Sequence, residues 1–224
     1  MKSPKDGHWQ KIMYDREFAN ETIGSTAYKK LGRTEASFLI RAVALKKGDR
    51  VLDVPCGVGR HAVVFAKRGI HVTGIDISAD CISLAKKTCH GLQVDLKTGD
   101  MSRLAGYRGK YDACVNLFSS FGYFSTDQKN EEVLRGMITT LKPGGKLVIH
   151  QIDRDWLLPK FKPADWIQQD DQLIINARKY DPSTHYNEAY RVAVDLTTGR
   201  ARTLYHRMRL YSKSETVALM KNAV

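Results

Sequence analysis

The sequence predicts an α/β fold whose core is a doubly wound, mostly parallel β-sheet. Short β-branched runs alternate with segments of helical periodicity from residue 50 to residue 152. Glycines follow two of the helical segments, where they favour helix termination. Alternation of this kind makes successive strands parallel, because each helix carries the chain back to the starting edge of the sheet. The 224 residues are enough to bury one such core with a small appendage.

Five strands are predicted between residues 50 and 152, and each is a short apolar run. They are RVLDVPC (50–56), HVTGIDIS (71–78), LQVDLKTGD (92–100), YDACVNLFSS (111–120) and the strand that follows the turn in LKPGGKLVIHQI (141–152). Three helices alternate with them: GRHAVVFAKRG (59–69), ADCISLAKKTCHG (79–91) and DQKNEEVLRGMITTL (127–141). Ser78 and Asp80 are both available as the N-cap of the second helix.

The pattern changes after Asp155, where three strands without intervening helices are predicted: QLIINARKYD (172–181), YNEAYRVAVDL (186–196) and ARTLYHRMRLYS (201–212). Turn signals join them, which favours an antiparallel insertion. A last helix, SKSETVALMKNA (212–223), has Ser214 as its predicted N-cap. The predicted organisation is an N-terminal helical cap (1–45), a cofactor-binding core (46–155), the insertion (156–212) and a C-terminal helix of the core (213–224).

Composition narrows the classes of function. The formal net charge is +12, but the excess of Lys and Arg is spread along the chain, whereas nucleic-acid-binding proteins concentrate it on one arm or face. No apolar run approaches the ~18 residues of a membrane span, and the N-terminus has no apolar signal region. Four scattered cysteines indicate neither a disulfide framework nor a metal site. We therefore expect a cytoplasmic protein with no metal, membrane or nucleic-acid partner.

The turn after the first strand, in VLDVPCGVGRHA (51–62), carries the main functional signal. Gly57, Gly59 and Ala62 fit the G-x-G-x-x-G/A fingerprint, and Asp76 ends the next strand, where an acid can hold ribose hydroxyls. These features suit any cofactor that contains adenosine. Asp53 discriminates among them, because a carboxylate at this point repels the pyrophosphate of NAD and attracts the sulfonium and ammonium of S-adenosylmethionine (SAM).

Two later motifs agree with this interpretation. In GDM (99–101), Asp100 can accept from an adenine amino group while Met101 supplies an apolar flank. NLFSSFGYF (116–124) places hydroxyls and aromatic rings at the carboxyl edge of the sheet, where doubly wound folds hold their ligands. Taken in order, VLDVPCGVGRHA, VTGIDIS, GDM, YDACVNLFSSFGYF and LKPGGKLVI resemble the motif set of class I SAM-dependent methyltransferases over residues 45–152.

The resemblance implies a cofactor site, with S-adenosylhomocysteine (SAH) as its product. Carried over residue by residue, it assigns the methionine moiety to Asp53, Gly57 and Gly59, the ribose to Asp76 and Ile77, the adenine to Asp100 and Met101, and the vicinity of the transferred methyl group to Leu117. Tyr14 is expected to close over the cofactor, as N-terminal tyrosines do in related enzymes.

The resemblance extends, more narrowly, to small-molecule methyltransferases such as the aminosugar N,N-dimethyltransferases and the glycine and sarcosine methyltransferases. It implies methyl transfer by in-line displacement to a nitrogen or oxygen of a small metabolite, with the protein supplying orientation and a base. His150, at the end of the fifth strand, and Tyr123 are the candidate bases. Tyr123 stands where some aminosugar relatives carry a histidine, so its phenol differs from an imidazole base.

Several alternatives stay open at this stage. One alternative interpretation is that the acceptor is RNA or protein instead of a small molecule. Another is that the chain is a catalytically silent SAM-fold subunit that binds a partner. The aromatic insertion forms either a lid over the acceptor or a homodimer interface. Relatives continue past the last helix into two more strands of the sheet. We therefore expect either a truncated sheet or a strand of 172–212 in the vacant position.

Overall fold

The computed structural model describes the backbone of residues 26–223 and the side chains from Lys30 to Ala223. The described chain forms two compact units. One, called the parallel unit below, contains residues 26–121, 131–151 and 222–223; the other, called the antiparallel unit, contains residues 122–130 and 152–221.

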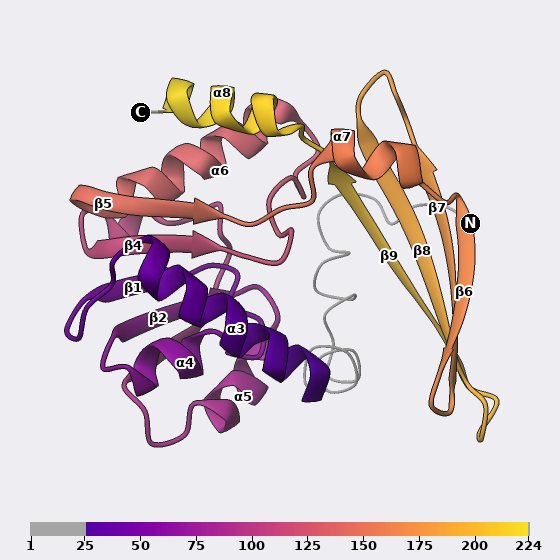
Figure 1. Ribbon diagram of the computed structural model, residues 1–224, viewed down its shortest axis with the longest axis horizontal. Coiled ribbons are helices and arrows are strands. Elements are labelled where there is room, and N and C mark those ends of the chain that lie inside the picture. The colour runs from indigo at the N-terminus through magenta and orange to yellow at the C-terminus, as the bar shows by residue number, and fades with distance from the viewer. Residues whose placement is uncertain (1–25, 224) are drawn as a thin grey trace. The chain divides into compact units, whose positions relative to one another are not determined.

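The parallel unit has helix α3 (Thr26–Ala42) followed by alternating strands and helices (Figure 1). Its strands are β1 (Arg50–Asp53), β2 (His71–Asp76), β3 (Val94–Thr98), β4 (Tyr111–Asn116) and β5 (Leu141–Ile149). Its helices are α4 (Ala62–Lys67), α5 (Ala79–Thr88), the 3₁₀ turn η2 (Ala105–Tyr107) and α6 (Asp127–Thr139), whose first residues belong to the other unit. All five strands are parallel in the order β3-β2-β1-β4-β5, which confirms the predicted sheet.

The strand order fixes where a ligand can bind. The chain starts in the middle of the sheet at β1, moves outward to β3, and then crosses back to β4 on the other side of β1. The order therefore reverses between β1 and β4, and doubly wound sheets hold their ligands at the carboxyl ends of strands beside such a reversal. Asp53 ends β1, where it pairs with Val115 of β4, and Asn116 ends β4.

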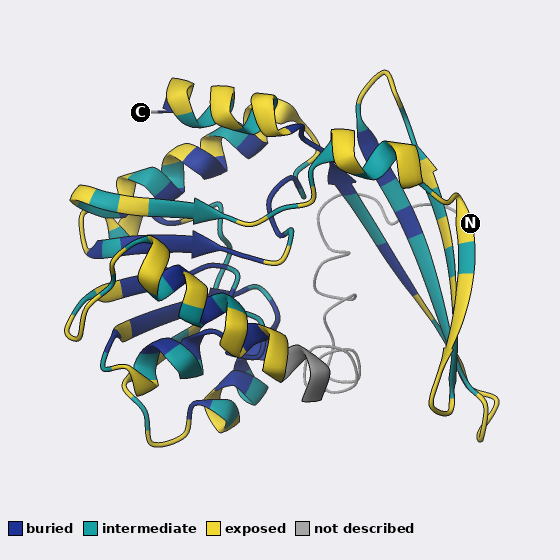
Figure 2. Cartoon of the chain, viewed as in Figure 1, coloured by how far each residue is buried: buried dark blue, intermediate teal, exposed yellow. Residues whose placement is uncertain are grey.

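The core of the parallel unit lies along these central strands. Val51, Ala113 and Val115 are fully buried and pack with Phe65 of α4 in one apolar cluster. Figure 2 shows the burial concentrated on β1, β2 and β4. The edge strand β3 alternates between exposed and half-buried residues, and its Lys97 forms an exposed ion pair with Asp95. Charged side chains of this kind protect an edge strand from pairing with another chain.

Helix α5 begins as the sequence predicts. The side chain of Ser78 accepts a hydrogen bond from the backbone N–H of Cys81 at 3.1 Å, so Ser78 is the N-cap and Asp80 is the acid of the first turn. The cap places the start of α5 directly after the end of β2, so that the last residue of β2 lies beside the first N–H groups of the helix.

The antiparallel unit contains helix α7 (Arg154–Leu157), the 3₁₀ turn η3 (Leu158–Lys160) and four strands: β6 (Ala164–Gln169), β7 (Gln172–Tyr180), β8 (Tyr186–Asp195) and β9 (Ala201–Arg209). They pair in the order β6-β7-β8-β9. The three predicted strands are confirmed, and β6 adds a fourth. Sequence periodicity does not indicate β6, because five of its six residues are exposed, which removes the alternation that identifies a half-buried strand.

The structure excludes one of the two alternatives expected for the parallel sheet, a strand of 172–212 in the vacant position, and it corrects the predicted cap of the last helix. None of its four strands joins the parallel sheet, in which β5 pairs only with β4 among the described strands. Helix α8 (Lys213–Ala223) is capped by Ser212, not by Ser214. The Ser212 hydroxyl accepts from the backbone N–H of Glu215 at 3.1 Å, and the Glu215 carboxylate accepts from the backbone N–H of Ser212 at 2.7 Å, which is a capping box.

The following statements on membrane-spanning helices and cysteines apply to residues 26–223. No helix in this range is long and apolar enough to cross a membrane. The four cysteines, all within this range, are buried and reduced.

Candidate cofactor site

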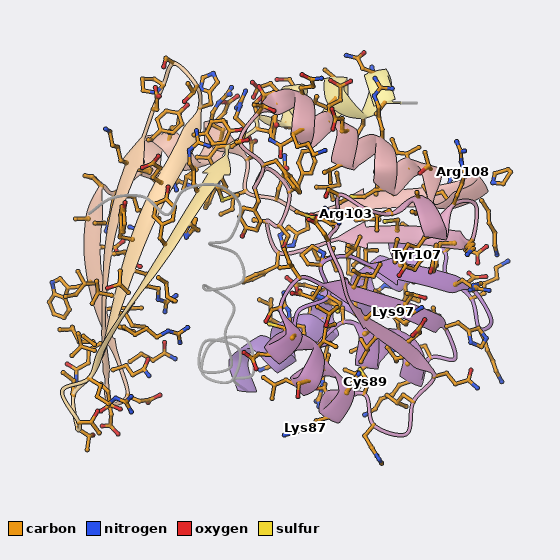
Figure 3. The ribbon with its side chains drawn as sticks, turned by 180° about the vertical axis from the view of Figure 1, so that it is seen from behind. Lys87, Cys89, Lys97, Arg103, Tyr107 and Arg108 are labelled. Atoms are coloured by element: carbon orange, nitrogen blue, oxygen red, sulfur yellow. The ribbon has the colours of Figure 1, made fainter. Side chains whose placement is uncertain are left out.

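The glycine turn after β1 has the backbone geometry that its sequence requires. Gly57 and Gly59 adopt left-handed φ angles of 53° and 77°. A Cβ atom on Gly59 would lie 3.1 Å from Sγ of Cys89 and 3.3 Å from Cβ of Ala85. Cys89 closes helix α5, and Figure 3 labels it within the parallel unit. Gly59 is therefore required both by its backbone angle and by the close approach of the turn to α5.

Asp76, at the end of β2, holds this turn in place. Its Oδ2 accepts from the backbone N–H of Gly57 at 2.8 Å, and its Oδ1 accepts from the backbone N–H of Ser78 at 2.9 Å. Burial raises the pKa of Asp76 to about 6, and these two hydrogen bonds oppose the rise. A backbone hydrogen bond from Ile77 also opposes the rise. The carboxylate thus ties the glycine turn to the start of α5 and keeps at least one lone pair for a ligand hydroxyl.

Asp53 has no such partners. Its side chain is fully buried at the end of β1, and neither carboxylate oxygen has a hydrogen-bond partner among the described residues. Burial raises the pKa of Asp53 to about 8, against the opposing influence of the Arg60 guanidinium and with a small further rise from Asp76. A buried carboxyl group without partners is unfavourable for folding, so its presence at the strand reversal indicates a ligand that supplies donors or positive charge.

Asn116, at the end of the neighbouring strand β4, is a site residue that the sequence analysis missed. Its Nδ2 donates to the backbone carbonyl of Val54 at 2.8 Å and lies 3.8 Å from Sδ of Met101. Its Oδ1 is fully buried and has no partner among the described residues. Asn116 therefore joins the turn after β1 to the segment after β3. Its sequence signal is its place at the start of the NLFSSFGYF motif, directly at the end of a predicted strand.

The remaining predicted cofactor residues lie in loops at the same edge of the sheet. Asp100 and Met101 follow β3 and are half-buried, and Oδ1 of Asp100 accepts from the backbone N–H of Ser102 at 2.8 Å. Leu117, directly after β4, is buried in the central apolar cluster. Ile77 follows β2 and is half-buried. The structure thus places all of them at the carboxyl ends of β2, β3 and β4.

The segment after Leu117 is strained. Phe118 and Ser119 adopt left-handed φ angles of 59° and 56°, although neither is glycine. Backbone hydrogen bonds to His150 hold this segment: the N–H of Ser119 donates to the His150 carbonyl at 2.8 Å, and the N–H of His150 donates to the Asn116 carbonyl at 2.9 Å. His150 is thereby fixed beside the end of β4, with half of its side chain exposed.

Two predicted residues are not among the described residues of the parallel unit. Tyr14 lies outside the described residues. Tyr123 is half-buried in residues 122–130, which belong to the antiparallel unit. A cluster of charged side chains that the sequence analysis did not single out lies beside the glycine turn. In this cluster, Glu35 of α3 contacts Arg60 and His61.

These residues fit SAM. The three unpartnered acceptor atoms, two on Asp53 and one on Asn116, lie at the ends of adjacent strands, where a ligand cation would supply what they lack. A pyrophosphate would instead bring negative charge against the Asp53 carboxyl group and the Asn116 carbonyl oxygen. The glycine turn and Asp76 offer the close approach and the lone pairs that an adenosine ribose needs.

Comparisons with known proteins agree with this geometry. Residues 51–145 match the model of the methyltransferase domain family. The dTDP-3-amino-3,4,6-trideoxy-alpha-D-glucopyranose N,N-dimethyltransferase of Streptomyces venezuelae is 31% identical over 120 residues, which cover 54% of this chain and 48% of that protein. The chain thus spans about half the length of this relative.

Two solved structures share the fold. The CcbJ methyltransferase of Streptomyces caelestis superposes with a TM-score of 0.81 at 19% identity, over 94% of this chain and 86% of that chain. SAM-bound CalS10, an amino pentose methyltransferase of Micromonospora echinaspora, superposes with a TM-score of 0.66 at 24% identity, over 86% of this chain and 82% of that chain. Residues 51–145 form a methyltransferase domain of the SAM-dependent type, and the chain has the class I fold of these enzymes.

Proposed function

We propose that the chain transfers a methyl group from SAM to a nitrogen or oxygen of a small-molecule acceptor. The observation that carries the proposal is the group of buried, unpartnered acceptors of Asp53 and Asn116 at the strand reversal. Small-molecule methyltransferases among the relatives support the choice of acceptor class. Our two alternatives are an RNA or protein acceptor and a silent SAM-fold subunit that binds a partner.

In this proposal the chain binds and orients the cofactor through the residues at the carboxyl edge. Asp53 and Asn116 hold the ammonium group, and the glycine turn of Gly57 and Gly59 accommodates the methionine moiety. We assign the ribose to Asp76 and Ile77. We assign the adenine to Asp100 and Met101, and the surroundings of the transferred methyl group to Leu117. When bound, SAM supplies an electrophilic methyl group, so the protein has to provide position, exclusion of water and a base.

His150 is the base that we propose, because it is half-exposed and fixed beside the end of β4. Tyr123 remains a second candidate, and Tyr14 remains the residue proposed to close over the cofactor. A base is needed because an amine must attack in its neutral form and a hydroxyl must lose its proton.

The antiparallel sheet is proposed either to line the acceptor pocket or to form a homodimer interface. Trp166 and Ile175, which pair across β6 and β7, are exposed by 67% and 43% of their surface. Exposed apolar side chains of this size favour contact with another molecule. Sedimentation velocity distinguishes the two roles: a dimer that dissociates on Trp166→Ser supports the interface, and a monomer supports the pocket wall.

Calorimetric titration with SAM, SAH and NAD tests the cofactor. We expect micromolar dissociation constants for SAM and SAH and no heat with NAD. Absence of binding by both sulfur compounds would contradict the proposal.

Transfer of a labelled methyl group tests the acceptor. The panel contains amines, phenols, dTDP-3-amino-3,4,6-trideoxy-α-D-glucopyranose, total RNA and a peptide mixture. We expect label on an amine or hydroxyl of a small molecule. Label confined to RNA or peptide would establish the first alternative, and tight SAM binding without any transfer would favour the silent subunit.

A further inference from the structure

Beside the glycine turn, the parallel unit holds a cluster of charged and titratable side chains from three segments. Glu35 comes from α3, Arg60 and His61 directly follow Gly59, and His150 follows β5. Arg60 and His61 are buried, and Glu35 is exposed by only 18% of its side chain. The cofactor residues named above do not include Glu35, Arg60 or His61.

The two oxygens of Glu35 have different surroundings. Nη2 of Arg60 lies 3.0 Å and Nε2 of His61 lies 2.8 Å from Oε2. The other oxygen, Oε1, lies 3.9 Å from Nδ1 of His150. Because Oε2 accepts from buried His61 and forms an ion pair with buried Arg60, the carboxylate is held in place, and Oε1 stays turned toward the imidazole of His150.

The charge states in the cluster follow from burial and contact. Burial alone would raise the pKa of Glu35, but the hydrogen bond from His61 and the charge of Arg60 hold it below its usual value, so Glu35 is an anion at neutral pH. Burial lowers the pKa of His61, which is therefore neutral. An ionised carboxylate can only accept, so His61 carries its proton on Nε2.

The packing around Arg60 explains how this arrangement is held. Gly32 lies one turn before Glu35 in α3, and a Cβ atom on Gly32 would lie 3.0 Å from Cγ of Arg60. A glycine inside a helix is unfavourable by about 1 kcal/mol relative to alanine, and here it lets α3 rest on the Arg60 side chain. The guanidinium also lies 4.6 Å from the centre of the Phe118 ring, in the strained segment after β4.

We infer that Glu35 is a positioning residue that orients His150 as the base for methyl transfer. The inference rests on the proposed function and adds a residue to it. Glu35 holds the proton of the neutral imidazole on Nδ1, which leaves the lone pair of Nε2 for the acceptor. The 3.9 Å separation is longer than a hydrogen bond, as is common for catalytic pairs before substrate binds.

The chemical step balances with this assignment. The acceptor oxygen or nitrogen forms a bond to the methyl carbon, and the bond from that carbon to sulfur breaks with its electron pair going to sulfur. The acceptor's proton passes to Nε2 of His150, and the resulting imidazolium is stabilised by the Glu35 carboxylate. The site therefore suits an acceptor that has a proton to lose, such as a hydroxyl or a primary or secondary amine.

The tautomer of His150 tests the inference without any acceptor. Ring ¹⁵N shifts are recorded at about pH 9, where an ordinary histidine with a pKa near 6.5 is neutral, and His150→Gln assigns the signal. We expect the Nδ1–H form in the wild-type protein. In Glu35→Gln, Arg60 and His61 retain the amide oxygen, so the amide NH₂ group faces Nδ1, and we expect the Nε2–H form.

Glu131→Gln is the matched control, since Glu131 pairs with Arg135 at 2.7 Å on the exposed side of α6, away from the cluster. It should leave the tautomer of His150 unchanged. The Nε2–H form in the wild-type protein, or the same tautomer in wild type and Glu35→Gln, would overturn the inference. Should Glu35→Gln not fold, the wild-type spectrum alone still decides, and Glu35→Asp, which keeps the charge, should preserve the Nδ1–H form.

Kinetics separate this inference from the proposed function. With an acceptor found by label transfer, Glu35→Gln should lower kcat by about 10²-fold, as loss of a general base does, and should leave the SAH dissociation constant unchanged. Unchanged kcat together with normal SAH binding contradicts the role of Glu35 alone. Absence of SAH binding by the wild-type protein contradicts the proposed function itself.

Discussion

Two acidic side chains, Asp53 in the parallel unit and Glu215 in the antiparallel unit, have opposite surroundings. In the parallel unit, burial raises the pKa of Asp53 to about 8, and neither of its oxygens has a partner among the described residues. In the antiparallel unit, Glu215 accepts from Arg209 at 3.0 Å and from Arg154 at 2.6 Å. Burial alone would raise the pKa of Glu215, but these contacts and the backbone N–H of Ser212 lower it to about 2.

The contrast distinguishes a carboxylate kept for a ligand from one kept for the fold. Glu215 and Asp165, which accepts from Arg178 at 2.9 Å, have their charges balanced within the chain. The charge of Asp53 is not balanced by a described residue in the same way, so we expect a bound ligand to balance it. Removal of each kind of group should therefore affect a different measurement: ligand affinity for Asp53 and stability for Glu215.

The largest expected effect is on cofactor affinity. Asp53→Ala should weaken SAH binding by at least about 30-fold, because removing one partner of a buried charge pair typically costs about 2–5 kcal/mol. The affinity for 5′-methylthioadenosine, which has no ammonium group, should change little. Calorimetry measures both constants.

Asp112→Ala is the control for this substitution. Asp112 pairs with Lys142 at 2.7 Å near the start of β4, at the opposite edge of the same sheet. It should leave both affinities unchanged. An equal loss for SAH and 5′-methylthioadenosine in Asp53→Ala would mean that Asp53 only supports the fold of the site. Stronger NAD binding in that variant would point to a dinucleotide enzyme.

A second prediction concerns pH. A raised pKa keeps Asp53 protonated in the free protein up to about pH 8, whereas a bound ammonium favours the carboxylate. SAH binding should therefore release up to about one proton, and the affinity should rise by up to tenfold per pH unit between about pH 6.5 and 8. Asp76 contributes mainly below this range, because its pKa is raised to about 6.

Calorimetry in buffers of different ionisation enthalpy measures the released proton. The release should disappear above about pH 9 and should be absent with 5′-methylthioadenosine at any pH. A pH-independent affinity for SAH would show that Asp53 is already ionised in the free protein, and the proposed difference between the two units would then be lost.

Folding stability provides the third prediction. Glu215→Gln should lower the free energy of unfolding by about 2 kcal/mol at pH 7, a value reduced for the partial exposure of the carboxylate. The folded pKa of Glu215 lies below its ordinary value, so its contribution is present above about pH 4.5 and is lost as the pH falls through about 2. Urea unfolding at pH 7 and pH 3 measures the difference.

The two variants should therefore affect different quantities. Glu215→Gln should leave the dissociation constant of SAH unchanged at temperatures where the variant is folded. Asp53→Ala should retain the thermal midpoint of the wild-type protein or exceed it above pH 7. Ionising the buried Asp53 disfavours the folded state as the pH rises from about 4 to 8, and alanine removes that penalty. A destabilised Asp53→Ala at pH 8 would contradict it.

Sequence periodicity identified the elements in which burial follows a regular pattern. Strands β1, β2 and β4 are apolar on both faces because a parallel sheet buries both, so their runs stood out clearly. Strand β6 escaped because it is an exposed edge strand whose register comes from pairing with β7. That pairing is a tertiary property, and the local sequence around Trp166 contains no alternation that reports it.

The residues of the candidate site also fall into two groups, those that a local sequence pattern predicts and those that only tertiary packing brings together. Asp53, Gly57, Gly59 and Asp76 were predictable, because a turn with fixed backbone angles requires particular residue types at fixed spacing. Glu35 was not, because it lies in α3, far from the glycine turn in sequence, and only the packing of α3 on Arg60 brings the two together. Residues that meet through long-range packing have no fixed spacing in the sequence, so no motif identifies them.

The smallest predicted effect concerns the start of α8, where the sequence and the structure name different caps. Ser212→Ala should lower the free energy of unfolding by about 1 kcal/mol, since it removes the acceptor for the N–H of Glu215. Ser214→Ala should change it by only a few tenths, because the Ser214 hydroxyl contacts only that of Ser212, at 2.9 Å. Equal losses in thermal unfolding would favour Ser214 as the cap. A loss confined to Ser212→Ala would confirm Ser212 as the cap, because alanine removes the hydroxyl acceptor and keeps the backbone N–H that binds the Glu215 carboxylate.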